Sequence, residues 1–269
     1  MAHQHYRTKG IVLTKEDSGE ADRVFALYTE DFGKLEVVGK AIRKITSKLR
    51  SGIELFSFTE IEFIQGKAQK TLTDAILLDS FFNVRQNPKK LALAWQISQT
   101  VDCLANKEEK DEKIWNLLFN AFQKLNSLSA NGNSEVIFYY FLWNFFSLLG
   151  YSPQLYNCAL CEKKLLPETF FFMPSQGGVV CWQCFAKIKK EKELEFKEIG
   201  QNGNHIREIF KKQANEIAVD TVKLIRFFLA ESMEKAERLT VLDKELKNLS
   251  QAFEMYFGFL SESCGLAIA

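Results

Sequence analysis

The sequence predicts an α+β protein in which short strands come first and helices follow. Three observations predict this order: β-rich runs fill the first 80 or so residues, helical periodicity begins after Asn87-Pro88, and 269 residues suffice for about two domains. Hydrophobic residues make up 46% of the chain and charged residues 26%, so the composition is that of a globular protein with a real core. Disorder and a small disulfide scaffold are thereby disfavoured.

Five short strands are expected in the N-terminal part, at residues 11–13, 24–29, 35–38, 56–64 and 71–78. Gly33 can take the left-handed conformation that closes a hairpin between the second and third strands, and Gly66 lies between the last two. Five strands at near-regular spacing fit a small barrel such as the OB-fold, although periodicity alone does not separate it from an SH3-like barrel. We expect this barrel over residues 1–82.

Helices are expected from Asn87-Pro88 onward, because this pair suits the N-cap and first position of a helix. Apolar stripes at helical spacing cover residues 91–101 and 114–125, and Ser134 can cap the aromatic run 136–151. That run is shorter than the roughly 20 residues of a membrane span, which favours a buried core helix. Further helices are expected at 204–213, 220–233 and 242–260. The helical domain should cover residues 83–269.

Four of the six cysteines form two CxxC pairs, Cys158 with Cys161 and Cys181 with Cys184, separated by 19 residues. Two such turns can bring four sulfurs around one zinc ion, and the spacing is typical of a four-cysteine site. Since the polar N-terminus shows no signal-peptide core, we expect a cytoplasmic protein with reduced thiols, which favours metal over disulfides. We predict a structural Zn²⁺ in a segment of about 155–186, because four thiolates leave no coordination position for a water molecule.

A basic stretch runs from residue 34 to residue 50, although the whole chain has a formal net charge of only +1. One acid, Glu36, faces six cations, which we predict to contact nucleic acid: Lys34, Lys40, Arg43, Lys44, Lys48 and Arg50. The stretch lies between the third and fourth expected strands, beside the face that OB-folds use for single strands. The alternative is a solvated loop and helix face without a ligand.

An enzyme is not expected from this sequence. No GxxxxGK[ST], GxGxxG or GxSxG motif occurs, and the three histidines, His3, His5 and His205, are not placed for acid–base chemistry. Cys103 and Cys264 have no nearby ligand residue in the sequence and are interpreted as bystanders.

Several spaced motifs occur together in one bacterial family. In the N-terminal part they are Gly10-Ile-Val-Leu13, Gly19-Glu-Ala-Asp-Arg23, Leu27-Tyr-Thr-Glu-Asp-Phe-Gly-Lys34 and Ser47-Lys-Leu-Arg50. Farther on they are Phe138-Tyr-Tyr-Phe-Leu142, Leu148-Leu-Gly-Tyr-Ser-Pro153 and Gly177-Gly-Val-Val-Cys181. In this order they resemble the bacterial RecO family over most of residues 6–186. Beyond about residue 200 the resemblance rests on helical character alone.

The resemblance implies an N-terminal OB-fold, a helical domain with a zinc-binding insertion, and a non-enzymatic role in DNA repair and recombination. Such proteins bind single- and double-stranded DNA and anneal complementary strands. They engage the C-terminal tail of the single-stranded-DNA-binding protein and, with RecR, help to load RecA, so the protein would join the nucleoid at damaged DNA. For the tail, Lys223 and Arg226 are the candidate cations.

Two other classes of function stay open at this point. A zinc-containing protein–protein scaffold would leave the basic stretch as a solvated surface. A hydrolase or transferase would need catalytic groups that the closed metal site and the missing motifs do not supply.

Overall fold

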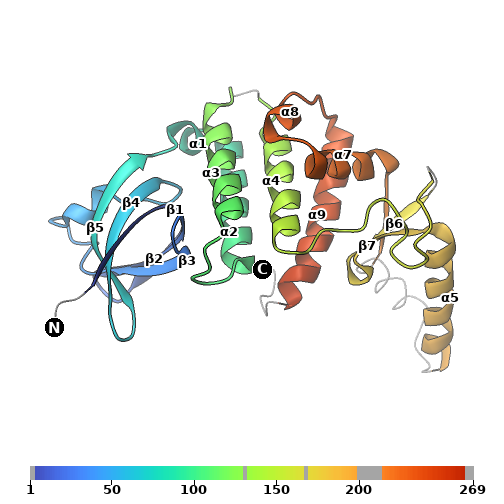
Figure 1. Cartoon of the computed structure of the whole chain (residues 1–269), viewed down its shortest axis with the longest axis horizontal. Helices are drawn as coiled ribbons and strands as arrows, with labels where there is room; N and C mark the ends of the chain where they lie inside the picture. Colours follow the sequence, from blue (N-terminus) through green and yellow to red (C-terminus); the bar gives the residue numbers. More distant parts are fainter. Residues whose placement is uncertain (1–3, 130–131, 167–168, 199–213, 264–269) are drawn as a thin grey trace. The chain divides into compact units, whose positions relative to one another are not determined.

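The computed structural model describes residues 4–129, 132–166, 169–198 and 214–263 (Figure 1). The chain forms two compact units, Met1–Phe141 and Leu142–Ala269, and the division falls inside the helix α4 (Ser134–Leu148). The predicted boundary at residue 82 separates the barrel from the helices that follow it, and it stays a prediction. Each unit is described separately below.

The first unit contains the predicted five-stranded barrel. Its strands are β1 (His5–Ser18), β2 (Asp22–Thr29), β3 (Gly33–Gly39), β4 (Phe58–Gln65) and β5 (Lys70–Asp79). They close in the order β1-β2-β3-β5-β4, in which β1 pairs with both β2 and β4 and a parallel contact joins β3 to β5. This is the OB-fold arrangement, so the α+β prediction is confirmed.

The strand β1 is much longer than the predicted run 11–13, because one end pairs with β4 and the other with β2. A register shift between Val12 and Thr14 marks the point where the strand bends from one partner toward the other. The strand β4 begins two residues later than predicted, because Phe56 has a left-handed backbone (φ 56°).

The barrel core consists of alternating side chains from all five strands together with two residues of the β3–β4 connection, Ile42 and Ile53. This connection also contains the short 3-10 helix η1 (Lys48–Ser51). The helices α1 (Phe82–Gln86), α2 (Pro88–Leu104) and α3 (Glu112–Ser127) follow the barrel. The Asn87 side chain accepts hydrogen bonds from the N–H groups of Lys89 and Lys90, which makes it the N-cap of α2 as predicted.

The second unit surrounds the C-terminal half of α4 and includes a three-stranded sheet in the order β7-β6-β8. Its elements after α4 are β6 (Phe170–Met173), the 3-10 helix η2 (Pro174–Gln176), β7 (Gly178–Cys181), α5 (Trp182–Glu198), β8 (Asn215–Ile217), α7 (Val219–Ala230), α8 (Met233–Glu237) and α9 (Asp243–Ser263). The predicted helix 220–233 is two helices, because the backbone is extended at Glu231 and Ser232. The predicted helix 204–213 lies outside the described residues.

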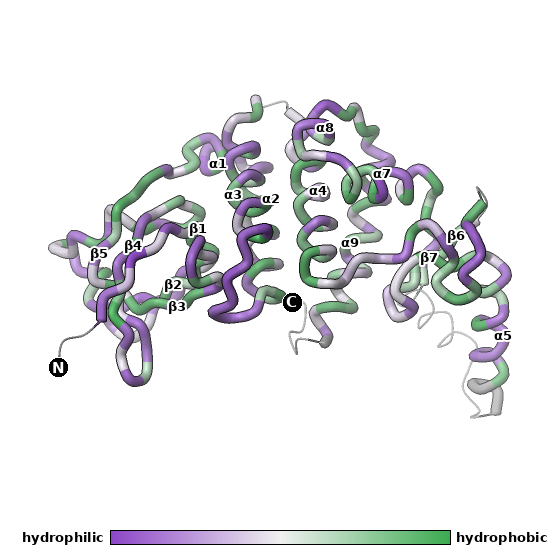
Figure 2. Tube along the Cα trace, in the orientation of Figure 1, coloured by the Kyte–Doolittle hydropathy of each residue, from purple (hydrophilic) through white to green (hydrophobic). Residues whose placement is uncertain are grey.

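Aromatic side chains form the core of this unit. Trp143 on α4 is fully buried, stacks on Tyr256 of α9 at a centroid distance of 5.7 Å and meets Phe172 of β6 edge-on. Figure 2 shows that α4 carries mostly hydrophobic residues along its length. In the described part of the chain, no helix is long and apolar enough to cross a membrane. The aromatic run therefore belongs to the protein interior, as predicted.

Two glycines with the same backbone angle test how closely the barrel packs against the segment after α2. Gly19 and Gly33 both have φ 61°, but a Cβ at Gly33 would lie 2.0 Å from the Glu109 carbonyl oxygen, whereas a Cβ at Gly19 meets nothing within 4 Å. Gly19→Ala should therefore cost only the roughly 1–2 kcal/mol of a left-handed alanine. Gly33→Ala should cost clearly more in urea unfolding, and equal losses for the two variants would contradict the packing.

Candidate metal centre and nucleic-acid interface

The four paired cysteines come together in the second unit. Cys158 and Cys161 lie in a turn after Leu155, while Cys181 ends β7 and Cys184 lies in the first turn of α5. All four sulfurs lie within 4.8 Å of one another, and the Cys161 and Cys181 sulfurs are 4.0 Å apart. A zinc ion with Zn–S bonds of about 2.3 Å would require sulfurs about 3.8 Å apart at the corners of a tetrahedron. The donor set and its spacing therefore fit a tetrahedral metal ion.

Backbone hydrogen bonds build this cluster. Gly177 has the left-handed φ of 75° that turns β6 into β7, and the Ala159 N–H then donates to the Val179 carbonyl at 2.9 Å. The Cys181 N–H donates to the Cys158 sulfur at 3.4 Å. The first CxxC turn is thereby held against the strand that leads into the second.

The surroundings of Cys158 favour the ionised thiolate form of its side chain. Burial raises the pKa of the Cys158 thiol, but N–H donors of Cys161, Cys181 and Leu160 outweigh it and hold that pKa at about 6. Burial and the neighbouring thiols raise the pKa of Cys184 instead. Four adjacent thiols cannot all ionise without a compensating cation, and a bound metal ion supplies that charge. The four cysteines together can hold one metal ion.

The predicted basic stretch forms the anchored connection between β3 and β4. Ile42 is only 3% exposed and enters the barrel core, while the Ala41 N–H donates to an Asp22 carboxylate oxygen at 2.7 Å. The Ala41 N–H and then the Lys40 ammonium group hold the pKa of Asp22 below its usual range. The Arg43 N–H donates to the Ala21 carbonyl. These contacts fix the backbone from which the cations project, and we call residues 40–50 the basic loop.

The six predicted DNA-binding cations differ in their surroundings. Lys34 is buried and its ammonium group pairs with the Asp102 carboxylate at 2.8 Å, so it ties β3 to α2. Lys40 and Arg43 are exposed but paired with Asp22 and Asp17 at 2.9 and 3.4 Å. The remaining three, Lys44, Lys48 and Arg50, are exposed, and no carboxylate of the described residues lies within ion-pairing distance of them.

A small cleft of about 140 Å³ lies beside the basic loop and contains a cation that the sequence analysis missed. Three arginines line it, Arg23, Arg43 and Arg50, together with one acid, Glu54, and the apolar residues Phe25, Ile42 and Ile53. Arg23 is held by Asp17 at 2.8 Å, and this hydrogen bond lowers the pKa of Asp17. The pairing of Arg23 on β2 with Gly39 on β3 brings Arg23 next to the basic loop, about 20 residues later in the chain. Arg23 lies in no run of basic residues, so the sequence alone did not point to it.

Aromatic residues of the barrel do not line this surface as stacking partners. Phe25, Tyr28 and Phe56 are buried, while Phe32 and Phe58 are half-buried and packed against other rings. The exposed apolar side chain in the basic loop is Ile45, which is 94% exposed.

The other residues singled out from the sequence have different surroundings. Lys223 is exposed and pairs with Asp220, whereas Arg226 donates to the Leu155 carbonyl and lies over the Tyr156 ring at 4.6 Å. Arg226 thus holds the segment that leads into the first CxxC turn. Cys103 lies in α2 of the first unit and is not one of the four clustered cysteines, while His205 and Cys264 are outside the described residues.

Comparisons with known proteins agree with this architecture. The family model described as "Recombination protein O N terminal" matches residues 1–81, and "Recombination protein O C terminal" matches residues 85–200. A "DNA repair protein RecO" of Dehalococcoides mccartyi is 32% identical over 179 residues, covering 66% of this chain and 70% of that protein. In a second strain of D. mccartyi the identity is 29% over 258 residues, with coverages of 96% and 91%. In Caldanaerobacter subterraneus it is 30% over 191 residues, with coverages of 71% and 76%.

These matches place the barrel and the cysteine-bearing helical unit among the DNA repair proteins. The chain belongs to the RecO family.

The cysteine cluster leads to a direct metal test. The purified protein should contain one metal ion per chain, and Cys158→Ser should lose it and melt at a lower temperature, because the ligands hold two distant turns together. Chelation should have the same effect and expose the segment 155–186 to proteolysis. Cys103→Ser is the matched control and should keep the metal. An unchanged melting curve after confirmed metal removal would contradict a structural metal.

Proposed function

We propose that this chain is a recombination mediator that acts by binding DNA and proteins. It binds single- and double-stranded DNA and anneals complementary strands. It engages the C-terminal tail of the single-stranded-DNA-binding protein and, with RecR, helps to load RecA. The observation that carries this proposal is the basic loop. It is anchored in an OB barrel and presents three cations that pair with no carboxylate of the described residues, in a chain that is almost neutral overall.

The DNA-contact surface that we propose contains Lys40, Arg43, Lys44, Lys48 and Arg50, together with Arg23 of the cleft. Lys34 does not belong to it, because its ammonium group is buried against Asp102. Lys and Arg contacts to phosphates release counterions, which supplies affinity without sequence preference. In the cleft, planar guanidinium groups can hold a phosphate through paired hydrogen bonds.

Ile45 adds a component that does not depend on salt. Ile45 is exposed among the cations that we propose to bind phosphates, so we expect it to contact a nucleobase of bound DNA. Isoleucine is among the residues that proteins insert between base steps. Since single strands expose the faces of their bases, this contact favours single-stranded DNA. It complements the charge contacts on either side.

We assign the metal as Zn²⁺ with a structural role. Four thiolates in tetrahedral spacing suit zinc, and a site closed by four protein ligands has no position for a reacting water. This supports a protein that works by binding rather than by turnover. The metal orients the CxxC segment of the second unit.

The acidic, apolar tail of the single-stranded-DNA-binding protein needs a basic, partly apolar surface in the helical part. Lys223 remains the candidate cation there, because it is exposed on α7. Arg226 is already engaged by Leu155 and Tyr156, so its role would be to support the surface rather than to contact the tail directly.

The electrostatic part of the proposal is tested by the triple variant Lys44→Ala, Lys48→Ala, Arg50→Ala. Its affinity for a single-stranded oligonucleotide should fall, and the slope of log affinity against log salt should become shallower by about one unit per lost phosphate contact. Lys235→Ala, an exposed lysine of α8, is the control and should change neither quantity. Wild-type affinity that did not depend on salt would contradict the proposal.

The variant Ile45→Ala separates base contact from charge. It should bind single-stranded DNA several-fold more weakly with an unchanged salt slope, because no cation is lost. Leu77→Ala, which removes an exposed apolar side chain from β5, should bind like the wild type. Equal affinities of Ile45→Ala and the wild type would exclude the base contact while leaving the phosphate contacts standing.

Annealing tests the mediator role. Complementary strands coated with single-stranded-DNA-binding protein should anneal in the presence of this chain, and removal of the C-terminal tail from the coating protein should abolish the acceleration. Lys223→Ala should weaken the tail-dependent part alone. Absence of binding to both single- and double-stranded DNA would instead favour a protein–protein scaffold.

A further inference from the structure

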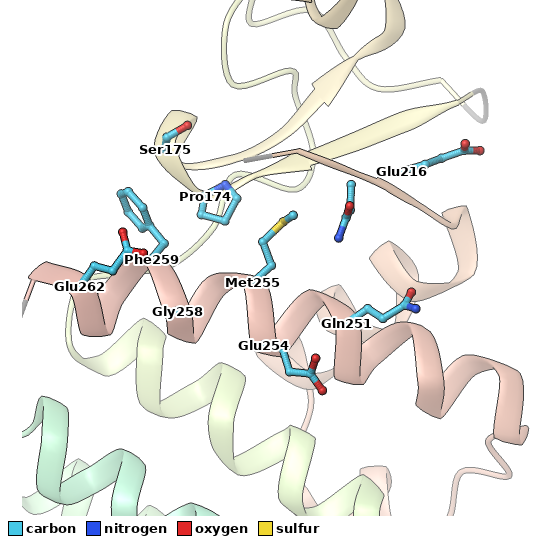
Figure 3. A pocket seen from close by; sticks show the side chains of 10 residues that line it. Pro174, Ser175, Glu216, Gln251, Glu254, Met255, Gly258, Phe259 and Glu262 are labelled. Carbon is cyan, nitrogen blue, oxygen red and sulfur yellow. The ribbon is translucent and has the colours of Figure 1, made fainter. Parts of the chain in front are cut away.

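A groove of about 820 Å³ lies in the second unit, between α9 on one side and β8 and η2 on the other (Figure 3). Among the described residues, no cysteine and no residue of the basic loop lines it. The residues on α9 that line it recur every three or four positions, from Gln251 through Met255 and Gly258 to Glu262. This spacing places them along one face of the helix over three turns.

Apolar side chains form one part of the groove lining, beside the polar Ser175, Asn215 and Gln251. Met255 and Phe259 of α9 face Pro174 of η2 in the middle of Figure 3. Phe259 is 43% exposed, although it is one of the largest apolar side chains of the helix. An exposed aromatic ring beside a thioether in a hollow is a feature of peptide-binding surfaces, because both side chains adapt to apolar partners.

The rim of the groove is acidic. Glu216 comes from β8, and Glu254 and Glu262 come from α9. Glu254 accepts a hydrogen bond from the Ser250 hydroxyl at 2.9 Å. Within the described ranges, no lysine or arginine lies within ion-pairing distance of these three carboxylates. Among the described residues, the groove therefore presents three carboxylates without a paired cation beside the apolar side chains of Pro174, Met255 and Phe259.

Gly258 of α9 is one of the residues that line the groove. Glycine in the interior of a helix costs roughly 1 kcal/mol relative to alanine, so a glycine in the middle of α9 weakens the helix. Gly258 lines the groove between Met255 and Glu262, where a larger side chain would project into it.

We propose that the groove binds a lysine- and arginine-rich peptide segment of a partner protein, with one apolar side chain of that segment packed on Met255 and Phe259. The cations of the segment pair with Glu216, Glu254 and Glu262. The negative rim repels nucleic acid and the acidic tail of the single-stranded-DNA-binding protein, so this occupant differs from both ligands proposed above. The thioether and the aromatic ring do not suit Mg²⁺ or Ca²⁺, which prefer oxygen ligands.

Methyl NMR of the full chain gives a direct test, because there are only four methionines, Met1, Met173, Met233 and Met255. With methyl-labelled methionine, the Met255 signal should shift saturably when a short peptide with lysines flanking Leu-Phe is added. Met233 of α8, which does not line the groove, should not shift. The same peptide with glutamates in place of lysines should leave Met255 unchanged. Equal shifts with both peptides, no shift with either, or a shift on addition of single-stranded DNA would overturn the proposal.

Two variants connect the signal to the groove. The double variant Glu254→Lys, Glu262→Lys should bind the lysine peptide at least tenfold more weakly than the wild type. The control Glu191→Lys on α5 should bind it like the wild type. Gly258→Leu fills the hollow without changing charge and raises helix propensity, so it should fold and lose peptide binding. Its affinity for DNA should be unchanged, since the basic loop is intact. Undiminished peptide binding by both groove variants would contradict the assignment.

Discussion

The burial of Ile42 in the barrel core is the constraint on which the proposed DNA-contact surface depends. Ile42 and Ile53 pack among the side chains of β2, β3 and β4, so the loop between them is attached to the barrel at both ends. Asp22 and Ala21 hold the backbone on either side of Ile42 by accepting hydrogen bonds from the N–H groups of Ala41 and Arg43. The cations therefore project from a fixed frame. A flexible loop of the same charge would lose part of its binding energy to ordering.

Charge is sorted along this chain, although its total is +1. The basic loop gathers cations on the barrel, whereas the groove along α9 gathers carboxylates beside apolar side chains. Phosphates and acidic tails are attracted to surfaces of the first kind, and basic peptides to surfaces of the second. If the chain acts as the mediator that we propose, surfaces of opposite sign would allow it to discriminate between DNA and its protein partners.

The sequence was most informative where local spacing determines the structure. Alternating apolar residues and turn glycines predicted the barrel, and the two CxxC pairs predicted the sulfur cluster, because each signal lies within a few residues. Structure that depends on long-range pairing could not be predicted from the sequence. The three residues of β8 have no strand pattern of their own and form a strand because they pair with β6. Arg23 lines the cleft because the register of β2 and β3 places it beside the basic loop. Lys34 is buried because its ammonium group pairs with Asp102 on α2. Neither effect can be found by counting charges along the sequence. The exposure of Ile45 likewise depends on the anchoring of Ile42 in the barrel core.

Lysine acetylation of the protein–DNA complex tests the central claim most directly, because it reports which ammonium groups the DNA covers. Single-stranded DNA should protect Lys44 and Lys48 of the basic loop, while Lys223 and Lys235 of the second unit should react as fast as in the free protein. Lys34 should react slowly with or without DNA, because it is already buried. Protection of the second unit's lysines with an unprotected basic loop would contradict the account.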